Sequence, residues 1–145
     1  MVRIPDKSPE GMLVIAIGER AFMGENMTEV NLPASIVSIG KAAFARCTSL
    51  TNISVDGASA MYASAGGVLF NREMTTLICY PSGKSDATYT IPRSVTRIDD
   101  MAFSSVASLA SVGYAGTEKQ WRSVSVGANN DSLNTGKMTF APPEK

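Results

Sequence analysis

The chain has 145 residues, of which 44% are hydrophobic and 18% are charged, and this composition is typical of one globular domain rather than of a disordered or fibrous protein. Thirteen basic residues balance thirteen acidic residues, so the chain lacks the basic excess with which proteins bind nucleic acid or anionic membranes. There is no histidine, which removes the commonest general base and the commonest metal ligand.

Residues 2–32 are predicted to form the first coil of a repeating structure. The coil contains the hexapeptide "IGERAF" at 17–22 and ends in "MTEVNL" at 27–32. Apolar and polar residues alternate in "VNL", and this period predicts a short strand whose apolar side chains point inward. The longest apolar stretch, "MLVIAI" at 12–17, is far too short to span a bilayer, so we expect no membrane insertion of this segment.

Residues 33–55 are predicted to form the second coil. Pro33 ends the preceding strand because proline lacks the N–H that a strand ladder needs. The segment "SIVSIG" is a second short extended piece, with Ile36 and Ile39 pointing inward. The segment "KAAFARC" at 41–47 is predicted to be a single helical or 3₁₀ turn that carries the chain round a corner, where Phe44 fills the interior.

Residues 56–88 are predicted to interrupt the repeat with a hairpin. The apolar segments "VLF" at 68–70 and "LICY" at 77–80 flank the polar turn "NREMTT". The inward residues of this hairpin are predicted to be Val68, Phe70, Leu77 and Cys79.

Residues 89–114 are predicted to form a third coil, because Pro92 to Tyr114 repeats Pro33 to Val55 with seven identities in 23 positions. Residues 115–140 are then expected to cap the C-terminal end. Thr117 and Gln120 fit a capping box for a short helix that reaches Trp121, and "SVSVG" and "KMTF" are predicted to be strands.

The recurring hexapeptide explains the organisation of the chain. "IGERAF", "IGKAAF" and "IDDMAF" each stand at the corner of a coil, and one coil cannot bury its own apolar side, whereas stacked coils can. Phe22, Phe44 and Phe103 are predicted to form a buried interior ladder, with Ile39, Ile98, Leu50 and Leu109 completing the structural core. The alternative interpretation is a set of unrelated amphipathic helices that begin alike.

The common pattern L-x-x-I-x-I-P-x-S-V-x-x-I-G-x-x-A-F-x-x-C resembles the BspA-like leucine-rich repeats of bacterial surface proteins. The resemblance covers nearly the whole chain, and residues 66–92 and 114–127 resemble the hairpin and the terminal segment of that family. It implies one domain over residues 1–145: a β-rich α/β solenoid, a right-handed superhelix of short parallel strands with a hairpin interruption and a C-terminal cap. The sequence departs from the pattern in the first coil, where Ile4 and Ile17 are 13 residues apart, whereas Leu32 and Ile39 are 7 apart.

No catalytic site is predicted. Without histidine, the Ser-His and Cys-His arrangements are excluded. The acidic residues fall in predicted turns and loops, and we interpret them as charges that keep the surface solvated. Asp99 and Asp100 are placed on a solvated corner. We predict no metal and no cofactor. Cys47 and Cys79 are predicted to be reduced, buried thiols, with a disulfide between them as the alternative.

A binding site is predicted on the strand face, because solenoids use this face as an extended surface. The outward positions assigned to it are Glu29, Asn31, Asn52, Ser54 and Ser111. Core packing is favoured over sugar stacking for Tyr114 and Trp121.

Three functions are considered for such a chain. The first is a non-enzymatic surface or secreted module for protein binding or adhesion, with a protein partner and an extracellular or cell-surface location, as the resemblance implies. The second is a structural spacer or ancillary domain of a larger secreted protein with no ligand of its own, which the uncapped first coil favours. The third, a glycan-processing enzyme, has little support in the sequence.

Overall fold

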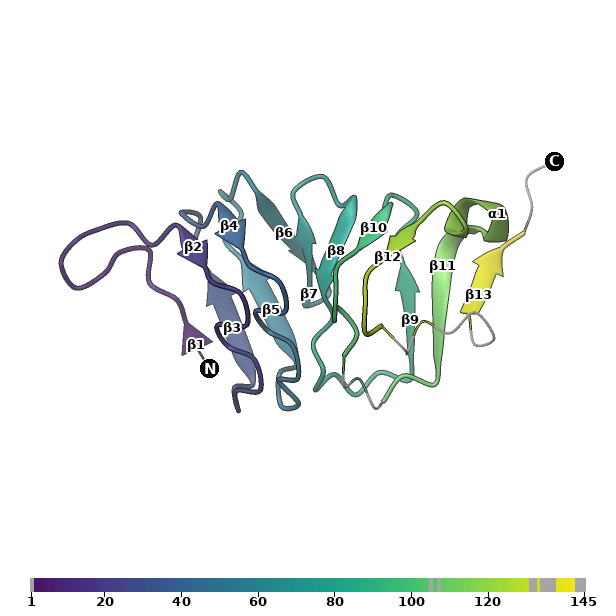
Figure 1. Ribbon diagram of the computed structural model, residues 1–145, viewed down its shortest axis with the longest axis horizontal. Helices are drawn as coiled ribbons and strands as arrows, with labels where there is room; N and C mark the ends of the chain where they lie inside the picture. Colours follow the sequence, from purple (N-terminus) through teal and green to yellow (C-terminus); the bar gives the residue numbers. More distant parts are fainter. Residues whose placement is uncertain (1, 105, 107, 131–132, 134–137, 143–145) are drawn as a thin grey trace.

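The computed structural model describes residues 2–104, 106, 108–130, 133 and 138–142. The chain winds as a β-solenoid of about five turns, which confirms the predicted fold class (Figure 1). The strands and the single helix of the described residues are β1 (Val2–Arg3), β2 (Ala16–Ile17), β3 (Glu29–Leu32), β4 (Ser38–Ile39), β5 (Asn52–Val55), β6 (Tyr62–Ala65), β7 (Val68–Asn71), β8 (Thr76–Cys79), β9 (Thr88–Ile91), β10 (Arg97–Ile98), β11 (Ser111–Thr117), α1 (Glu118–Trp121), β12 (Ser125–Val126) and β13 (Met138–Ala141).

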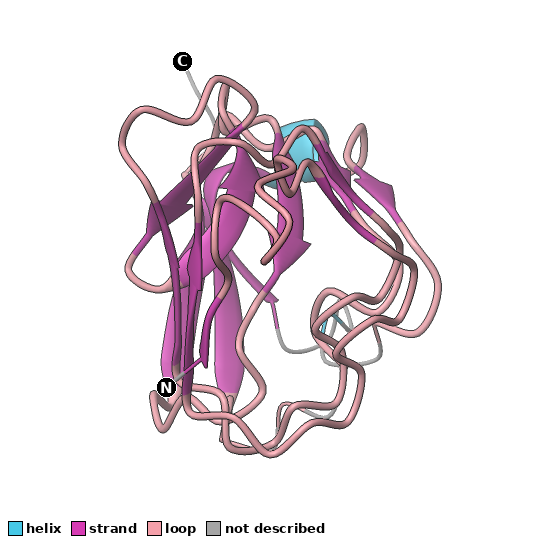
Figure 2. Cartoon of the chain, turned by 90° about the vertical axis from the view of Figure 1, so that its left-hand side faces the viewer, coloured by secondary structure: helices cyan, strands magenta, loops and turns pink. Residues whose placement is uncertain are grey.

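The strands gather on two sides of the coil (Figure 2). One side, called the β3 side, consists of the parallel sheets β1-β3-β5 and β9-β11-β13. The other, called the β4 side, consists of β2-β4 and the five-stranded sheet β12-β10-β8-β7-β6. The regular coils, such as β3 with β4 and β9 with β10, therefore contribute one strand to each side, and their apolar side chains point into the space between the two sides.

The corners of the coils are not α-helical, so the helical alternative of the sequence-based prediction is wrong, whereas the alternative of a single 3₁₀-type turn matches the local i→i−3 hydrogen bonds. Residues 41–46 form a series of turns, in which the N–H of Ala45 donates to the carbonyl of Ala42 at 3.2 Å. The intervening peptides point toward the neighbouring coil, so the N–H of Phe22 donates to the carbonyl of Ala43 at 2.8 Å. Because the backbone alternates between local and inter-coil bonds, it cannot make the i→i−4 bonds of an α-helix. Ala42 and Met101 adopt left-handed φ angles of 56° and 58° at equivalent corner positions.

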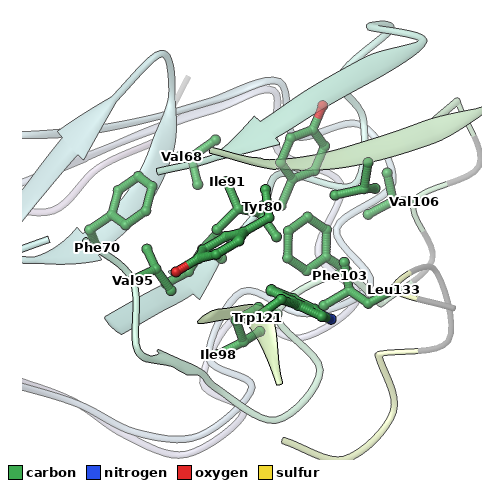
Figure 3. Close-up of a cluster of buried hydrophobic side chains, with 14 residues drawn as sticks. Val68, Phe70, Tyr80, Ile91, Val95, Ile98, Phe103, Val106, Trp121 and Leu133 are labelled. Atoms are coloured by element: carbon green, nitrogen blue, oxygen red, sulfur yellow. The ribbon is translucent and has the colours of Figure 1, made fainter. Parts of the chain in front are cut away.

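The three predicted ladder residues do not form one ladder. Phe22 stacks on Phe44 with ring centroids 5.6 Å apart, whereas Phe103 stacks on Tyr80 at 5.3 Å in a second apolar cluster (Figure 3). Tyr80 takes the aromatic position of the hairpin coil, because its N–H donates to the carbonyl of Ala102 as that of Phe22 donates to Ala43. Phe44, Phe103, Leu50 and Ile98 are buried, and Phe22, Ile39 and Leu109 are half-buried.

The interruption has three strands rather than two. β7 pairs antiparallel with β8, as the hairpin prediction requires, and also with β6, which the sequence analysis did not identify. Gly66 and Gly67 form the turn between β6 and β7 with φ angles of 59° and 84°, which favour glycine. Val68 and Phe70 pack into the cluster that contains Phe103, and Leu69 packs into the cluster that contains Phe44.

The two ends of the solenoid differ. The residues inserted between β1 and β2 form a loop that projects beyond the first coil (Figure 1). At the other end, α1 begins with the predicted capping box, in which the Thr117 hydroxyl accepts from the Gln120 N–H at 3.1 Å. Tyr114 and Trp121 are both buried, with ring centroids 5.2 Å apart.

Candidate binding site

Three polar side chains form a row across the first sheet of the β3 side. Val30, Leu32 and Ile53 point inward and are buried, so the residues that alternate with them point outward. The register pairs Arg3 with Asn31 and Asn31 with Ser54. The outward row therefore reads Arg3, Asn31, Ser54, with neighbouring strands about 4.8 Å apart.

The members of this row differ in how they are engaged. The Ser54 hydroxyl is hydrogen-bonded to the Oδ1 of Asn31, which joins β3 to β5 on the outer face. The Arg3 side chain forms no ion pair or hydrogen bond with any described residue, and Arg3 is exposed. The row thus presents one guanidinium group that is available to a ligand, next to a pair of side chains that hold each other in place.

A cleft of about 800 Å³ lies at the carboxyl ends of these three strands. The row Arg3, Asn31 and Ser54 forms part of its lining, and the segments that leave the strands form the rest, including Pro5, Asp6, Pro33, Ala34 and Asp56. The Asp56 carboxylate accepts a hydrogen bond from the Ala58 N–H at 2.9 Å. The cleft therefore joins a guanidinium group and two carboxylates to a small apolar surface, and its lining contains no aromatic side chain.

The predicted binding residues do not lie on one continuous surface. Glu29 pairs with Asn52 next to the row, so four of the five predicted residues lie together on β3 and β5. Ser111 lies on β11, in a different sheet. The separation arises because the N–H of Ile53 donates to Gly67 of the hairpin at 2.9 Å, where a regular coil would place β9. The expectation of a continuous strand face is therefore wrong.

Sequence reasoning missed Arg3 and the two aspartates of the cleft. A signal for Arg3 was present, because "VRIP" aligns with "VNLP" and places Arg3 at the position of Asn31. Asp6 and Asp56 follow the strands in segments of different length, so no repeat position links them. Their meeting at one cleft depends on the stacking of the coils.

The hairpin tip, the next candidate for a contact surface, is built around the side chain of Asn71. Its Oδ1 accepts hydrogen bonds from the N–H groups of Thr75 and Thr76 at 2.8 and 2.9 Å, and its Nδ2 donates to the Thr75 hydroxyl at 2.8 Å. All three contacts lie within the turn, so Asn71 shapes the hairpin.

The two thiols are free and buried, as predicted. Burial raises the pKa of Cys79 to about 12 and also raises the pKa of Cys47, so both stay protonated at neutral pH. A thiol must ionise to act as a nucleophile or metal ligand, and these two are therefore suited to packing. Among the described residues, no three cysteine or acidic side chains lie together as a candidate metal site.

Asp99 and Asp100 are more than solvated corner residues, and here the sequence interpretation is corrected. The Asp100 carboxylate accepts from the Ala128 N–H at 2.8 Å, and this hydrogen bond lowers its pKa. Asp100 also lies 3.5 Å from the Lys41 ammonium group. Asp99 is half-buried, which raises its pKa. The Asp100 carboxylate therefore connects successive coils at the corners, and the Asp99 carboxylate lies 3.4 Å from the Arg97 guanidinium group of its own coil.

The fold and the surface cleft define a leucine-rich-repeat solenoid. The family model for the BspA type leucine rich repeat region matches residues 13–77 and 78–134, with six copies of the repeat. The chain belongs to this family.

Three solved structures are similar to the chain. A leucine rich cell surface protein from Faecalibacterium prausnitzii is 38% identical over 79% of this chain and 29% of its own, with a TM-score of 0.68. The pneumococcal vaccine antigen PcpA is 25% identical over 91% of this chain and 32% of its own, with a TM-score of 0.74. A leucine-rich repeat protein from Eubacterium ventriosum shares the fold, with a TM-score of 0.67 at 20% identity, over 88% of this chain and 40% of its own.

The chain thus spans 29% to 40% of the length of these three structures. No curated protein matches the sequence. None of the helices in the described part of the chain has the length and apolar character needed to cross a membrane.

Proposed function

We propose that the chain is a non-enzymatic binding module outside the cell, which holds a protein partner against the outer face of β1, β3 and β5. The observation that carries the proposal is the row Arg3, Asn31 and Ser54 at the edge of a cleft of about 800 Å³. A guanidinium group without a partner among the described residues supplies a directional contact for carboxylates or carbonyl groups of a bound protein. The family and the cell-surface neighbour support the extracellular location.

A polypeptide is a better ligand for this cleft than a carbohydrate. Sugar rings are commonly held by aromatic faces, and the lining has none. The prolines and the alanine that line the cleft offer a small apolar surface, which suits contact with short side chains of a bound polypeptide. Asp6 and Asp56 flank this surface, so the cleft has charges of both signs and suits a partner with charges of both signs.

The experiment is a binding screen of the chain against matrix proteins and glycans, followed by variants of the β3 side. Replacing Asn31, Asn52 and Ser54 together with bulky charged residues is expected to abolish binding of a confirmed partner, and Arg3→Gln to weaken it. Replacing Ser111, which lies on another sheet, is the matched control and should leave affinity unchanged. Full affinity in the triple variant would show that a partner binds elsewhere.

The alternative function is a structural spacer or ancillary domain with no ligand of its own. One observation favours it: Asn31 and Ser54 are bonded to each other, and the outer face of β3 and β5 has no aromatic or arginine anchor of the kind that dominates protein interfaces. A screen in which no matrix protein or glycan binds would support this function over the binding module.

A further inference from the structure

We infer that the N-terminal end of the solenoid is an interface between two copies of this chain. The surface concerned consists of Met12, Leu13, Ile15 and Val37 and is called the N-terminal apolar patch. These side chains are 71%, 60%, 51% and 50% exposed, and they are four of the six large hydrophobic side chains that are exposed among the described residues. The N–H of Val37 donates to the carbonyl of Ile15 at 2.7 Å, so the two patch residues that directly precede β2 and β4 are adjacent.

The loop that carries half of this patch has a defined conformation. The N–H of Val14 donates to the Asp6 carbonyl at 2.8 Å, which closes the loop, and the N–H of Ser8 donates to the Met12 carbonyl at 2.7 Å. Gly11 makes the tip possible with a φ of 85°. The Ser35 hydroxyl holds the Val14 carbonyl at 2.6 Å. Because the loop is ordered in advance, docking it against another surface costs little conformational entropy.

An open strand edge lies beside the patch. The carbonyls of Ile15 and Ile17 accept hydrogen bonds from Val37 and Gly40, so they point toward β4. The N–H and the carbonyl of Ala16, which lies between them, therefore point away from β4, toward the outer edge of β2. β2 pairs with β4 and with no other described strand, which leaves its outer edge available to another extended segment.

The charges of the loop favour a second copy over a lipid surface. The loop carries Lys7 and Glu10, which are both exposed and have no side-chain ion pair with described residues. An anionic membrane attracts basic segments, whereas this loop, which also includes Asp6, has no basic excess. A two-fold interface brings the same surface of each copy together, so that surface must complement itself. A loop with one basic side chain, acidic neighbours and an apolar tip meets this requirement.

In the proposed dimer, β2 of one copy lies antiparallel to β2 of the other, so the sheet continues as β4-β2-β2-β4 across the two-fold axis. The projecting loop of each copy covers Ile15 and Val37 of the other. This arrangement closes on itself, whereas pairing of the N-terminal end with the C-terminal end would repeat without limit. The dimer does not depend on the binding function proposed for the β3 side.

The first test measures the molar mass of the full chain by light scattering and sedimentation over a range of concentrations. The mass should rise from that of one chain toward that of two chains and no further. The double variant Met12→Ser with Leu13→Ser should raise the dimer dissociation constant at least about tenfold, because two apolar side chains lose their cover. Val126→Ser is the matched control, since Val126 is 42% exposed but lies on β12, and it should leave the dissociation constant unchanged.

The second test uses an oxidisable residue in the patch. Cys47 and Cys79 are buried, so a cysteine introduced on the surface is the thiol that a mild oxidant reaches most readily. An equimolar mixture of Leu13→Cys and Val37→Cys chains should form a mixed covalent dimer under mild oxidation, because the loop of each copy covers Val37 of the other. A mixture of Leu13→Cys and Val126→Cys chains should not. Three results would overturn the proposal: a mass of one chain at all concentrations up to about 1 mM, where even a very weak complex would form; a mass that grows beyond two chains; or cross-linking of Leu13→Cys to Val126→Cys in place of Val37→Cys.

Discussion

Individual side chains in the corners decide how tightly the coils pack. Phe44 is 2% exposed and stacks on Phe22, which lies in the first coil and is only half-buried. The same residue type at the same repeat position therefore buries different areas in different coils. The hexapeptide "IGxxAF" predicts an inward aromatic ring, but the extent of burial depends on whether coils lie on both sides of it.

Truncation of Phe44 is expected to destabilise the protein more than truncation of Phe22. Phe44→Ala should lower the free energy of unfolding by about 3–5 kcal/mol, the usual loss for a buried aromatic side chain. Phe22→Ala should cost less, because its ring already contacts water. Denaturant unfolding measures both values. A loss below about 1 kcal/mol for Phe44→Ala, the scale of a surface change, would contradict the packing described here.

Tyr80 carries a hydroxyl group that the fold does not satisfy. The side chain is 1% exposed and lies among apolar residues such as Phe70 and Val95 (Figure 3), and its hydroxyl has no hydrogen-bond partner in the described part of the chain. An unsatisfied buried polar group costs about 1–3 kcal/mol. Tyr80→Phe should therefore raise the free energy of unfolding by about 1 kcal/mol, the lower end of that range.

The matched control is Tyr114→Phe. The Tyr114 hydroxyl donates to the Arg93 carbonyl at 3.2 Å, so its removal should lower stability by about 0.5–1.5 kcal/mol. Urea unfolding at neutral pH compares the two variants directly. A Tyr80→Phe variant that is as destabilised as Tyr114→Phe would show that the Tyr80 hydroxyl has a partner.

Stability is expected to fall on the alkaline side of neutrality. Burial raises the pKa of Cys79 to about 12 from 9.0, and that of Tyr80 to about 12 from 10.0. Because both folded-state pKa values exceed the unfolded ones, the unfolded state loses its protons first. The stabilisation is complete below pH 9 and is lost as the pH rises from about 9 to about 12.

Urea unfolding between pH 7 and pH 11 measures this loss. Cys79→Ala should reduce the part of the decline that begins near pH 9, to which Cys47 also contributes, and leave the part that begins near pH 10. An unchanged decline in this variant would assign the effect to other groups.

At the scale of the elements, the sequence predicted strands better than corners. Alternation in "VNL" and "ISV" located β3 and β5, and Pro33 marked the end of β3. Thr117 with Gln120 located the start of α1. The corners resemble the start of a helix because their residues are good helix formers, but the neighbouring coil takes the N–H groups that a helix would use. β6 was missed because "YASA" does not alternate in polarity, and its pairing depends on β7.

The turn between β7 and β8 depends on the side chain of Asn71. This side chain satisfies the N–H groups of Thr75 and Thr76, which have no strand partner at those positions. Asn71→Ala should lower the free energy of unfolding by about 1–3 kcal/mol, because two partly buried donors lose their acceptor. Arg72→Ala, at the exposed neighbouring position, is the control and should change stability by less than about 0.5 kcal/mol. Chemical denaturation measures both, and equal effects would show that the hairpin does not depend on Asn71.

At the scale of the whole molecule, the repeat predicted the solenoid, and the stacked coils contain two apolar clusters. The sequence could assign Asn31 and Ser54 to one outward row because both belong to repeated strands. It could not predict that Ser111 lies on a separate sheet, since this follows from the bond between Ile53 and Gly67. The cleft could not be predicted from the sequence either, because its aspartates come from connecting segments that share no repeat position.

The burial of β7 on both faces has a consequence for how this chain can change in evolution. Segments that interrupt a repeat are commonly regarded as additions that can be gained or lost without harm to the rest. Here Leu69 belongs to one apolar cluster and Val68 and Phe70 belong to the other, so the interruption is the joint between the two halves. A deletion that restored an even spacing of repeats would remove three strands of a five-stranded sheet and open both clusters to water. Duplication or loss of coils is therefore tolerated more readily on either side of residues 62–79 than within them, and this segment sets the boundary between two modules that have to be inherited together.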